Sequence, residues 1–203
     1  MQRLRNIVLL LAAASTAVSA LAQNYTPAPL GVVVQKEDLH FAEDFYRALV
    51  TVGTNKFAFF LPEGFRLNNN PADGSIKLIN REGSCKITFS ILGPVPETGE
   101  LNPETYRALL LEQHPDAKIL VESARGVAGQ NGPAFDLEWK GPSSITQSAR
   151  VLFVASPMGV LEFMAVSTPN NQALMQNSFG RVTGSFWISR DGKFEVLHPF
   201  TGS

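Results

Sequence analysis

Few side chains in this sequence have the types and spacing that catalysis requires. Nucleophilic hydrolysis needs an activated serine or cysteine beside a histidine and an orienting acid. The three histidines are scattered, at His40, His114 and His198, and no Gly-x-Ser-x-Gly motif occurs. We therefore predict no catalytic residues.

The single cysteine, Cys85, begins a run that alternates polar and apolar residues. One cysteine allows no intramolecular disulfide, so a reactive thiol and an intermolecular bridge are the functional alternatives. Neither a histidine nor an acid adjoins it to lower its pKa. We favour a half-buried strand residue over a reactive thiol.

Metal binding needs histidine, cysteine or acid side chains at ligand spacing. Glu37, Glu43 and Asp44 surround His40 at helical spacing and would share one face of a helix. A weak cation site there is conceivable, and a solvated polar face is favoured over it. Asn70 and Asp73 resemble part of a calcium loop without its alternating acids, and a plain turn is preferred there. We predict no metal and no cofactor.

Two residues form our hypothesis for a binding site. Trp139 ends an alternating strand beside Gly141, and Arg150 lies on the next strand. Together they could line a cleft between sheet and helix, although a tryptophan at the core edge is the plainer interpretation. His114 precedes Pro115 in the last turn of a helix, where an imidazolium would suit the helix dipole.

Three segments have helical spacing. Residues 36–50 place Leu39, Ala42, Tyr46 and Leu49 on one side. A second helix begins at Pro103, after the N-cap Asn102. A third covers residues 170–186 and contains Gly180 and Gly184, which we interpret as allowing it to lie close to the sheet.

Short alternating runs separated by turn residues predict strands, with tight turns that favour antiparallel pairing. The fold class is α+β, with a central, mostly antiparallel sheet of about six to eight strands sandwiched by helices. The predicted strands cover residues 57–61, 76–80, 86–92, 118–124, 134–140, 146–155 and 160–166.

The N-terminus has the three parts of a secretory signal peptide. Arg3 and Arg5 precede an apolar core, and Ala20 and Ala22 stand at −3 and −1 of a cut before Gln23. We predict cleavage between Ala22 and Gln23, a flexible leader over residues 23–35, and a single α+β domain over residues 36–203. With no cysteine at the cut, the mature protein is expected to be periplasmic or secreted, without a membrane anchor.

The charge balance argues against a nucleic-acid partner. The chain has 17 lysines and arginines and 18 acidic residues, a net charge of −1. Loss of Arg3 and Arg5 with the signal peptide leaves 15 against 18, a net charge of −3. Such a balance lacks the basic footprint of nucleic-acid or anionic-lipid binding.

Residues 54–189 resemble the PsbP-like superfamily. An aromatic strand runs into Pro62-Glu63-Gly64-Phe65, where that family typically has proline-x-glycine-tryptophan, and Phe65 replaces the tryptophan. The hairpin at residues 146–166 and the helix ending in Ser185-Phe186 also look like the family's C-terminal half. The resemblance implies an antiparallel sheet between helices and a binding or assembly role without catalysis.

The function we predict is therefore an exported, soluble binding or assembly protein. Its partner is an unspecified protein or small molecule. The alternatives are an envelope enzyme with a dispersed active site and a structural accessory of a larger envelope complex.

Overall fold

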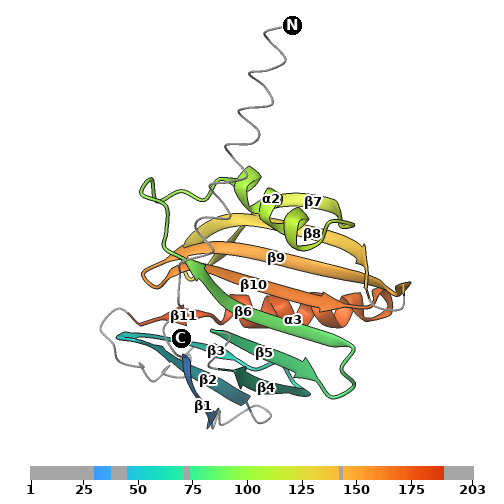
Figure 1. Cartoon of the computed structure of the whole chain (residues 1–203). Helices are drawn as coiled ribbons and strands as arrows, with labels where there is room; N and C mark the ends of the chain where they lie inside the picture. The colour runs from blue at the N-terminus through green and yellow to red at the C-terminus, as the bar shows by residue number, and fades with distance from the viewer. Residues whose placement is uncertain (1–29, 38–44, 71–73, 142–143, 190–203) are drawn as a thin grey trace, which may run out of the picture.

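Two antiparallel sheets form the frame of the molecule (Figure 1). The computed structural model describes residues 30–37, 45–70, 74–141 and 144–189. The larger sheet has seven strands in the order β4-β5-β6-β10-β9-β8-β7: β4 (Phe65–Asn70), β5 (Ser75–Asn80), β6 (Cys85–Gly93), β7 (Lys118–Val127), β8 (Gln130–Lys140), β9 (Thr146–Ser156) and β10 (Gly159–Ser167). The smaller sheet has the order β1-β2-β3-β11: β1 (Leu30–Glu37), β2 (Phe45–Val52), β3 (Asn55–Phe60) and β11 (Trp187–Ile188).

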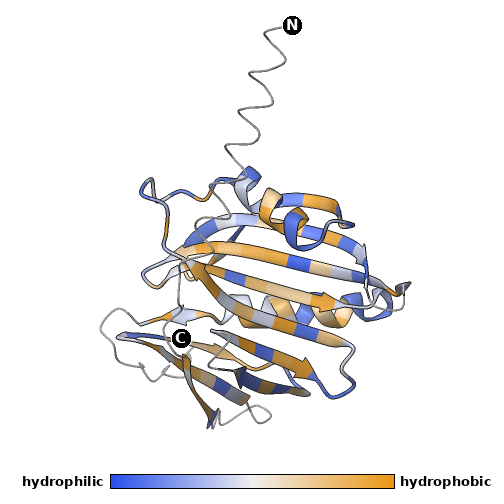
Figure 2. Ribbon diagram, viewed as in Figure 1, coloured by the Kyte–Doolittle hydropathy of each residue, from blue (hydrophilic) through white to orange (hydrophobic). Residues whose placement is uncertain are grey.

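The strands arise where apolar residues alternate with polar ones. Along β6, Ile87, Phe89 and Ile91 are buried on one face, as predicted. The hairpin of β9 and β10 turns between Ser156 and Gly159, also as predicted. Figure 2 shows this alternation as hydrophilic and hydrophobic bands along the strands.

The two faces of the seven-stranded sheet have different covers. The four-stranded sheet and α3 (Gln172–Gly184), which follows the short 3₁₀ turn η3 (Pro169–Asn171), pack on one face and share a continuous core with it. On the other face α2 (Pro103–Gln113) packs through Tyr106 and Leu110. Much of one cover is thus a second sheet, so the predicted sandwich between helices is only partly correct.

The helix predicted for residues 36–50 is wrong. Residues 45–52 form β2, in which Ala48, Val50 and Val52 point into the core at strand spacing. These residues pair with β1, which begins at Leu30, inside the predicted leader. Pairing with β1 and β3 forms the strand, and the burial of Ala48, Val50 and Val52 follows its period of two, so the helical spacing of Tyr46 and Leu49 does not define a buried face.

Several sequence predictions lie outside the described residues. These are the signal peptide, the cleavage site between Ala22 and Gln23, the first part of the leader, and the side chains of His40, Glu43, Asp44, Asp73 and His198. Within the described ranges, neither helix has the length and apolar character needed to span a membrane.

The local signals of α2 are confirmed, and so is the helix predicted for residues 170–186, whereas the interpretation of its two glycines was wrong. Asn102 Oδ1 accepts a hydrogen bond of 3.0 Å from the backbone N–H of Glu104, as an N-cap does. In α3, a Cβ added at Gly180 or Gly184 would meet nothing within 4 Å. Neither glycine is therefore needed for close packing on the sheet.

An aromatic cluster joins the two sheets and α3. The ring of Phe186, just beyond α3, lies 5.1 Å from that of Phe57, 5.8 Å from Phe89 and 5.0 Å from Phe163, between centroids. Such pairs stabilise a core by roughly 0.5–1.5 kcal/mol each beyond their area burial. The cluster fixes α3 against both sheets and so sets the position of the surface beside them.

Candidate functional site: an arginine-lined groove

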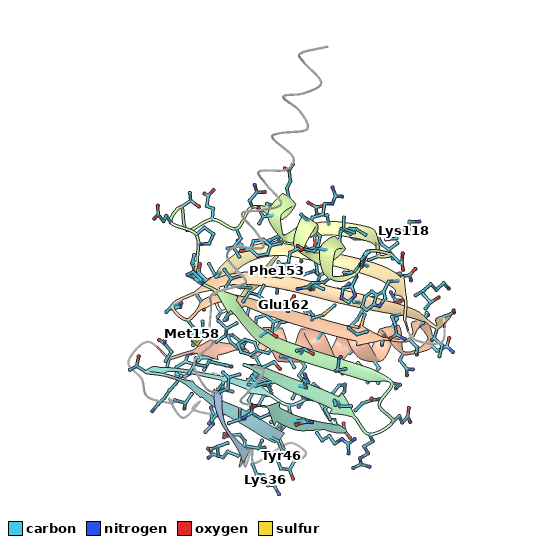
Figure 3. All side chains as sticks on the ribbon, viewed as in Figure 1. Lys36, Tyr46, Lys118, Phe153, Met158 and Glu162 are labelled. Carbon is cyan, nitrogen blue, oxygen red and sulfur yellow. The ribbon has the colours of Figure 1, made fainter. Side chains whose placement is uncertain are left out.

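A groove of about 930 Å³ lies where β1 and β2 approach the start of β4 and the side of α3. Its rim at the lower edge of the molecule is near Tyr46, which Figure 3 labels. A second depression of about 570 Å³ shares Pro62–Phe65, Arg81 and Arg181 with it. The groove is lined by Val34, Phe45, Tyr46, Leu61, Pro62, Glu63, Gly64, Phe65, Arg66, Leu67, Arg81 and Arg181.

The wall between the two depressions is a tight turn. The backbone N–H of Phe65 donates to the carbonyl of Pro62 over 3.2 Å, and Gly64 has a φ of +74°. Glycine suits the third position of such a turn because that position needs a positive φ. The N–H of Leu61 donates to the carbonyl of Tyr46 over 2.8 Å, which ties the turn to β2.

Three arginines from separate elements line the groove. Arg66 is on β4, and Arg81 follows β5 beside the turn because Phe65 pairs with Asn80. Arg181 comes from α3, and its guanidinium carbon lies 4.7 Å from the centroid of the Phe45 ring. Such a stack holds a guanidinium in place without neutralising its charge.

None of these three guanidinium groups forms an ion pair or a side-chain hydrogen bond with another described residue. Two acids, Glu63 and Glu82, are exposed at the rims. An unpaired guanidinium offers a planar fork of N–H donors that fits a carboxylate or phosphate. The groove therefore has binding capacity for negative charge that the described residues do not use.

The structure does not bring Trp139 and Arg150 together. Trp139 shares its face of the sheet with Phe135 and Leu137 under α2, and its ring stacks on His114 at 4.3 Å. Arg150 points to the opposite face, beside Leu152. Binding at either residue separately stays a prediction.

Arg150 already has a partner. Its Nε and Nη2 each donate to Asp136 over 2.7 Å, in a two-bond pair that neighbours a depression of about 310 Å³. Hydrogen bonding to Asp136 raises the pKa of Arg150, and burial opposes this rise. This pair links β8 to β9 and leaves Arg150 less available to bind a ligand than the arginines of the groove.

The other candidates from the sequence have structural roles. Burial lowers the pKa of His114, and the charge of Lys86 lowers it further, so the imidazolium expected at that helix end is disfavoured. Glu37 is on β1 and forms an ion pair with Arg47. Within the described ranges, no three histidine, cysteine or acid side chains are grouped as metal ligands.

Cys85 is a buried strand residue. Its side chain is 1% exposed, and burial raises the pKa of the thiol to about 11. Its backbone N–H donates to Asn80 Oδ1 over 2.9 Å. The interpretation as a strand residue is confirmed, with more complete burial than predicted.

Sequence reasoning missed Glu162. Glu162, labelled in Figure 3, is an 8% exposed residue of β10 that pairs with Phe153 and Ser90 on the neighbouring strands. Its Oε1 has no hydrogen-bond partner among the described residues. Burial raises its pKa to about 7. A lone acid within an apolar strand was the available signal. Glu162 is not among the residues that line the groove or the second depression.

No family profile and no curated protein sequence matches this chain. Its fold is similar to that of cyanobacterial PsbP from Synechocystis, with a TM-score of 0.48 and 14% identity over 82% of this chain and 96% of that one. It is also similar to LpqN, involved in cell envelope biogenesis of Mycobacterium tuberculosis, with a TM-score of 0.44 and 12% identity over 77% and 91%. Both likenesses are remote and concern the fold alone.

Proposed function

We propose that this chain is an exported, non-catalytic binding protein that holds its partner in the arginine-lined groove. One observation carries the proposal: three arginines line a single groove of about 930 Å³, and none of them has a carboxylate partner among the described residues. Ligand sites commonly have volumes of roughly 300–1,000 Å³ and a few polar groups among apolar walls. The groove has this composition.

The chemistry of the lining supports binding over catalysis. Guanidinium groups stay protonated and cannot act as general bases near neutral pH. Among the described residues that line the groove or its neighbour, none is a histidine or a cysteine. An enzyme with a dispersed site, the alternative, would need acid and base groups to converge there.

Export is supported by the N-terminal sequence, in which a positive segment, an apolar core and small residues occur in order. The test is expression in a bacterial host followed by fractionation and mass spectrometry of the intact protein. We expect a product that begins at Gln23 outside the cytoplasm. A full-length product confined to the cytoplasm would contradict export.

The groove is tested by amide NMR spectra of the labelled protein during titration with fractionated envelope extract. We expect shifts at Phe65, Arg66 and Arg181, which Arg181→Gln and Arg66→Gln reduce. Arg125→Gln is the matched control because Arg125 is an exposed arginine outside the groove. Shifts centred on Trp139, or unaffected by the groove variants, would refute this site.

A further inference from the structure

We infer that the groove binds an amphipathic anion, a molecule with one carboxylate or phosphate group on an apolar body. This inference rests on the proposed function and specifies its ligand class. It follows from the way cationic and apolar side chains are divided within one groove.

The apolar part of the groove lies between the two sheets. Val34 on β1 and Tyr46 on β2 are each 44% exposed and are diagonal neighbours, because Val34 pairs with Ala48 and Lys36 with Tyr46. Phe65 and Leu67 line the groove from β4 and pack against the shared core. Exposed apolar side chains facing partly buried ones provide a surface that an apolar ligand could cover.

A hydrogen bond joins the two sheets beyond one end of this apolar strip. The side-chain amide of Asn69 on β4 donates to the carbonyl of Leu30 on β1 over 3.0 Å, which joins the two sheets there. Further along these strands, Val34 and Phe65 line the groove.

The charged part of the groove lies beside the Pro62–Phe65 turn. Arg81 and Arg181 line both depressions, so they lie at the boundary between them, and Arg66 contributes to the larger one. Arg181 is half-buried and oriented by Phe45, whereas Arg66 and Arg81 are exposed. A headgroup that engages two guanidinium forks needs at least two acceptor oxygens, which a carboxylate or a phosphate has.

Four ligands, each added to the purified protein, separate the contribution of the arginines from that of the apolar side chains. Isothermal calorimetry with dodecanoate, dodecyl phosphate, inorganic phosphate and the neutral dodecyl maltoside compares the headgroup with the apolar body. We expect the first two to bind roughly tenfold or more tightly than the last two, because a charged hydrogen bond and apolar burial each contribute at this scale.

Variants then assign the contacts. We expect Arg181→Gln and Arg66→Gln each to weaken dodecanoate binding by roughly tenfold, and Val34→Ser to weaken it with little effect on inorganic phosphate. Arg125→Gln leaves all four affinities unchanged. Far-ultraviolet circular dichroism of each variant shows that the comparison is between folded proteins.

Four results would overturn the inference. Equal affinity for dodecanoate and dodecyl maltoside excludes recognition of the charge, and equal affinity for inorganic and dodecyl phosphate excludes use of the apolar strip. Binding to vesicles containing phosphatidylglycerol, without binding to the monomeric amphiphiles, would indicate a lipid surface instead. If envelope extract shifts the groove amides while the amphiphiles do not, this inference fails and the proposed function stands.

Discussion

Along β10, Leu161 and Phe163 flank Glu162 in a buried strand, and Glu162 itself lacks a hydrogen-bond partner at Oε1. Burial raises its pKa from 4.5 to about 7. The folded state therefore binds a proton that the unfolded state releases above pH 4.5. The contribution of this proton to the stability of the folded state is complete below pH 4.5 and is lost as pH rises through about 7.

We predict that Glu162→Gln removes this loss of folding stability at high pH. A pKa rise of this size corresponds to about 3 kcal/mol between the two protonation states. Urea unfolding at pH 5 and pH 8 should show the native protein losing stability of this order at pH 8 and the variant losing much less. Glu63→Gln, at an exposed acid, is the control. Equal pH dependence in all three proteins would contradict the assignment to Glu162.

Gly132 on β8 is a residue with no room for a side chain. A Cβ there would lie 1.7 Å from the backbone oxygen of Phe153 on β9. We predict that Gly132→Ala destabilises the protein by about 3 kcal/mol or more, because backbone must move to admit the methyl group. Thermal or urea unfolding measures it. A change below about 0.5 kcal/mol would show that the strands can separate without strain.

The helices and strands were predictable from the sequence where the buried residues recur at a single spacing, that of a helix or that of a strand. On β6 and in the second half of β8 the apolar alternation coincides with the buried face, and at α2 the Asn102-Pro103 start is local. The segment at residues 36–50 contains both periods, and only its pairing with β1 and β3 decides between them. Such pairing is a long-range property that a local pattern does not contain.

The groove was beyond sequence reasoning for the same reason. The Pro62–Phe65 turn could be singled out, but Arg181 joins it only because α3 docks between β3, β6 and β10. Arg66 and Arg81 come together through the register of β4 and β5. In sequence these are three separate arginines in a chain of near-neutral charge.

At the element scale, α3 contains an avoidable glycine. Gly180 is exposed within the helix, and an added Cβ would meet nothing within 4 Å. We predict that Gly180→Ala stabilises the protein by about 1 kcal/mol, since alanine loses less backbone entropy in a helix. Urea unfolding measures the change. Gly64→Ala is the contrasting control, because its positive φ should make the same substitution destabilising.

If Gly180→Ala instead lowers stability, the prediction is wrong and Gly180 is needed for close packing of α3 on the sheet. Gly180 also lines the depression that contains Arg150 and Arg125. Because this depression is separate from the groove lining, the variant should retain full binding of any groove ligand.

For the molecule as a whole, the shared core makes the two sheets interdependent. The aromatic cluster includes Phe57 from the smaller sheet and Phe89 and Phe163 from the larger one. A ligand held between β1, β2 and β4 would contact both sheets and stabilise them together, by mass action on the folded state. Ligand binding in the groove should therefore raise the unfolding midpoint of the entire protein.

Cys85 provides a measure of this whole-molecule stability. Its thiol lies in the shared core, and the reactive thiolate needs both exposure and a pKa below its folded value of about 11. We predict that a thiol reagent at pH 8 labels native protein more slowly than urea-unfolded protein by on the order of a thousandfold or more. Absorbance of the released reagent group measures both rates.

The stability variants show whether labelling follows global unfolding. Gly132→Ala should accelerate labelling and Gly180→Ala should slow it, each by tenfold for every 1.4 kcal/mol of changed stability. Ser123→Cys, at an exposed position on β7, is the positive control for rapid labelling. If neither glycine variant alters the rate at Cys85, β6 opens locally, and the larger sheet does not unfold as one unit with the aromatic core.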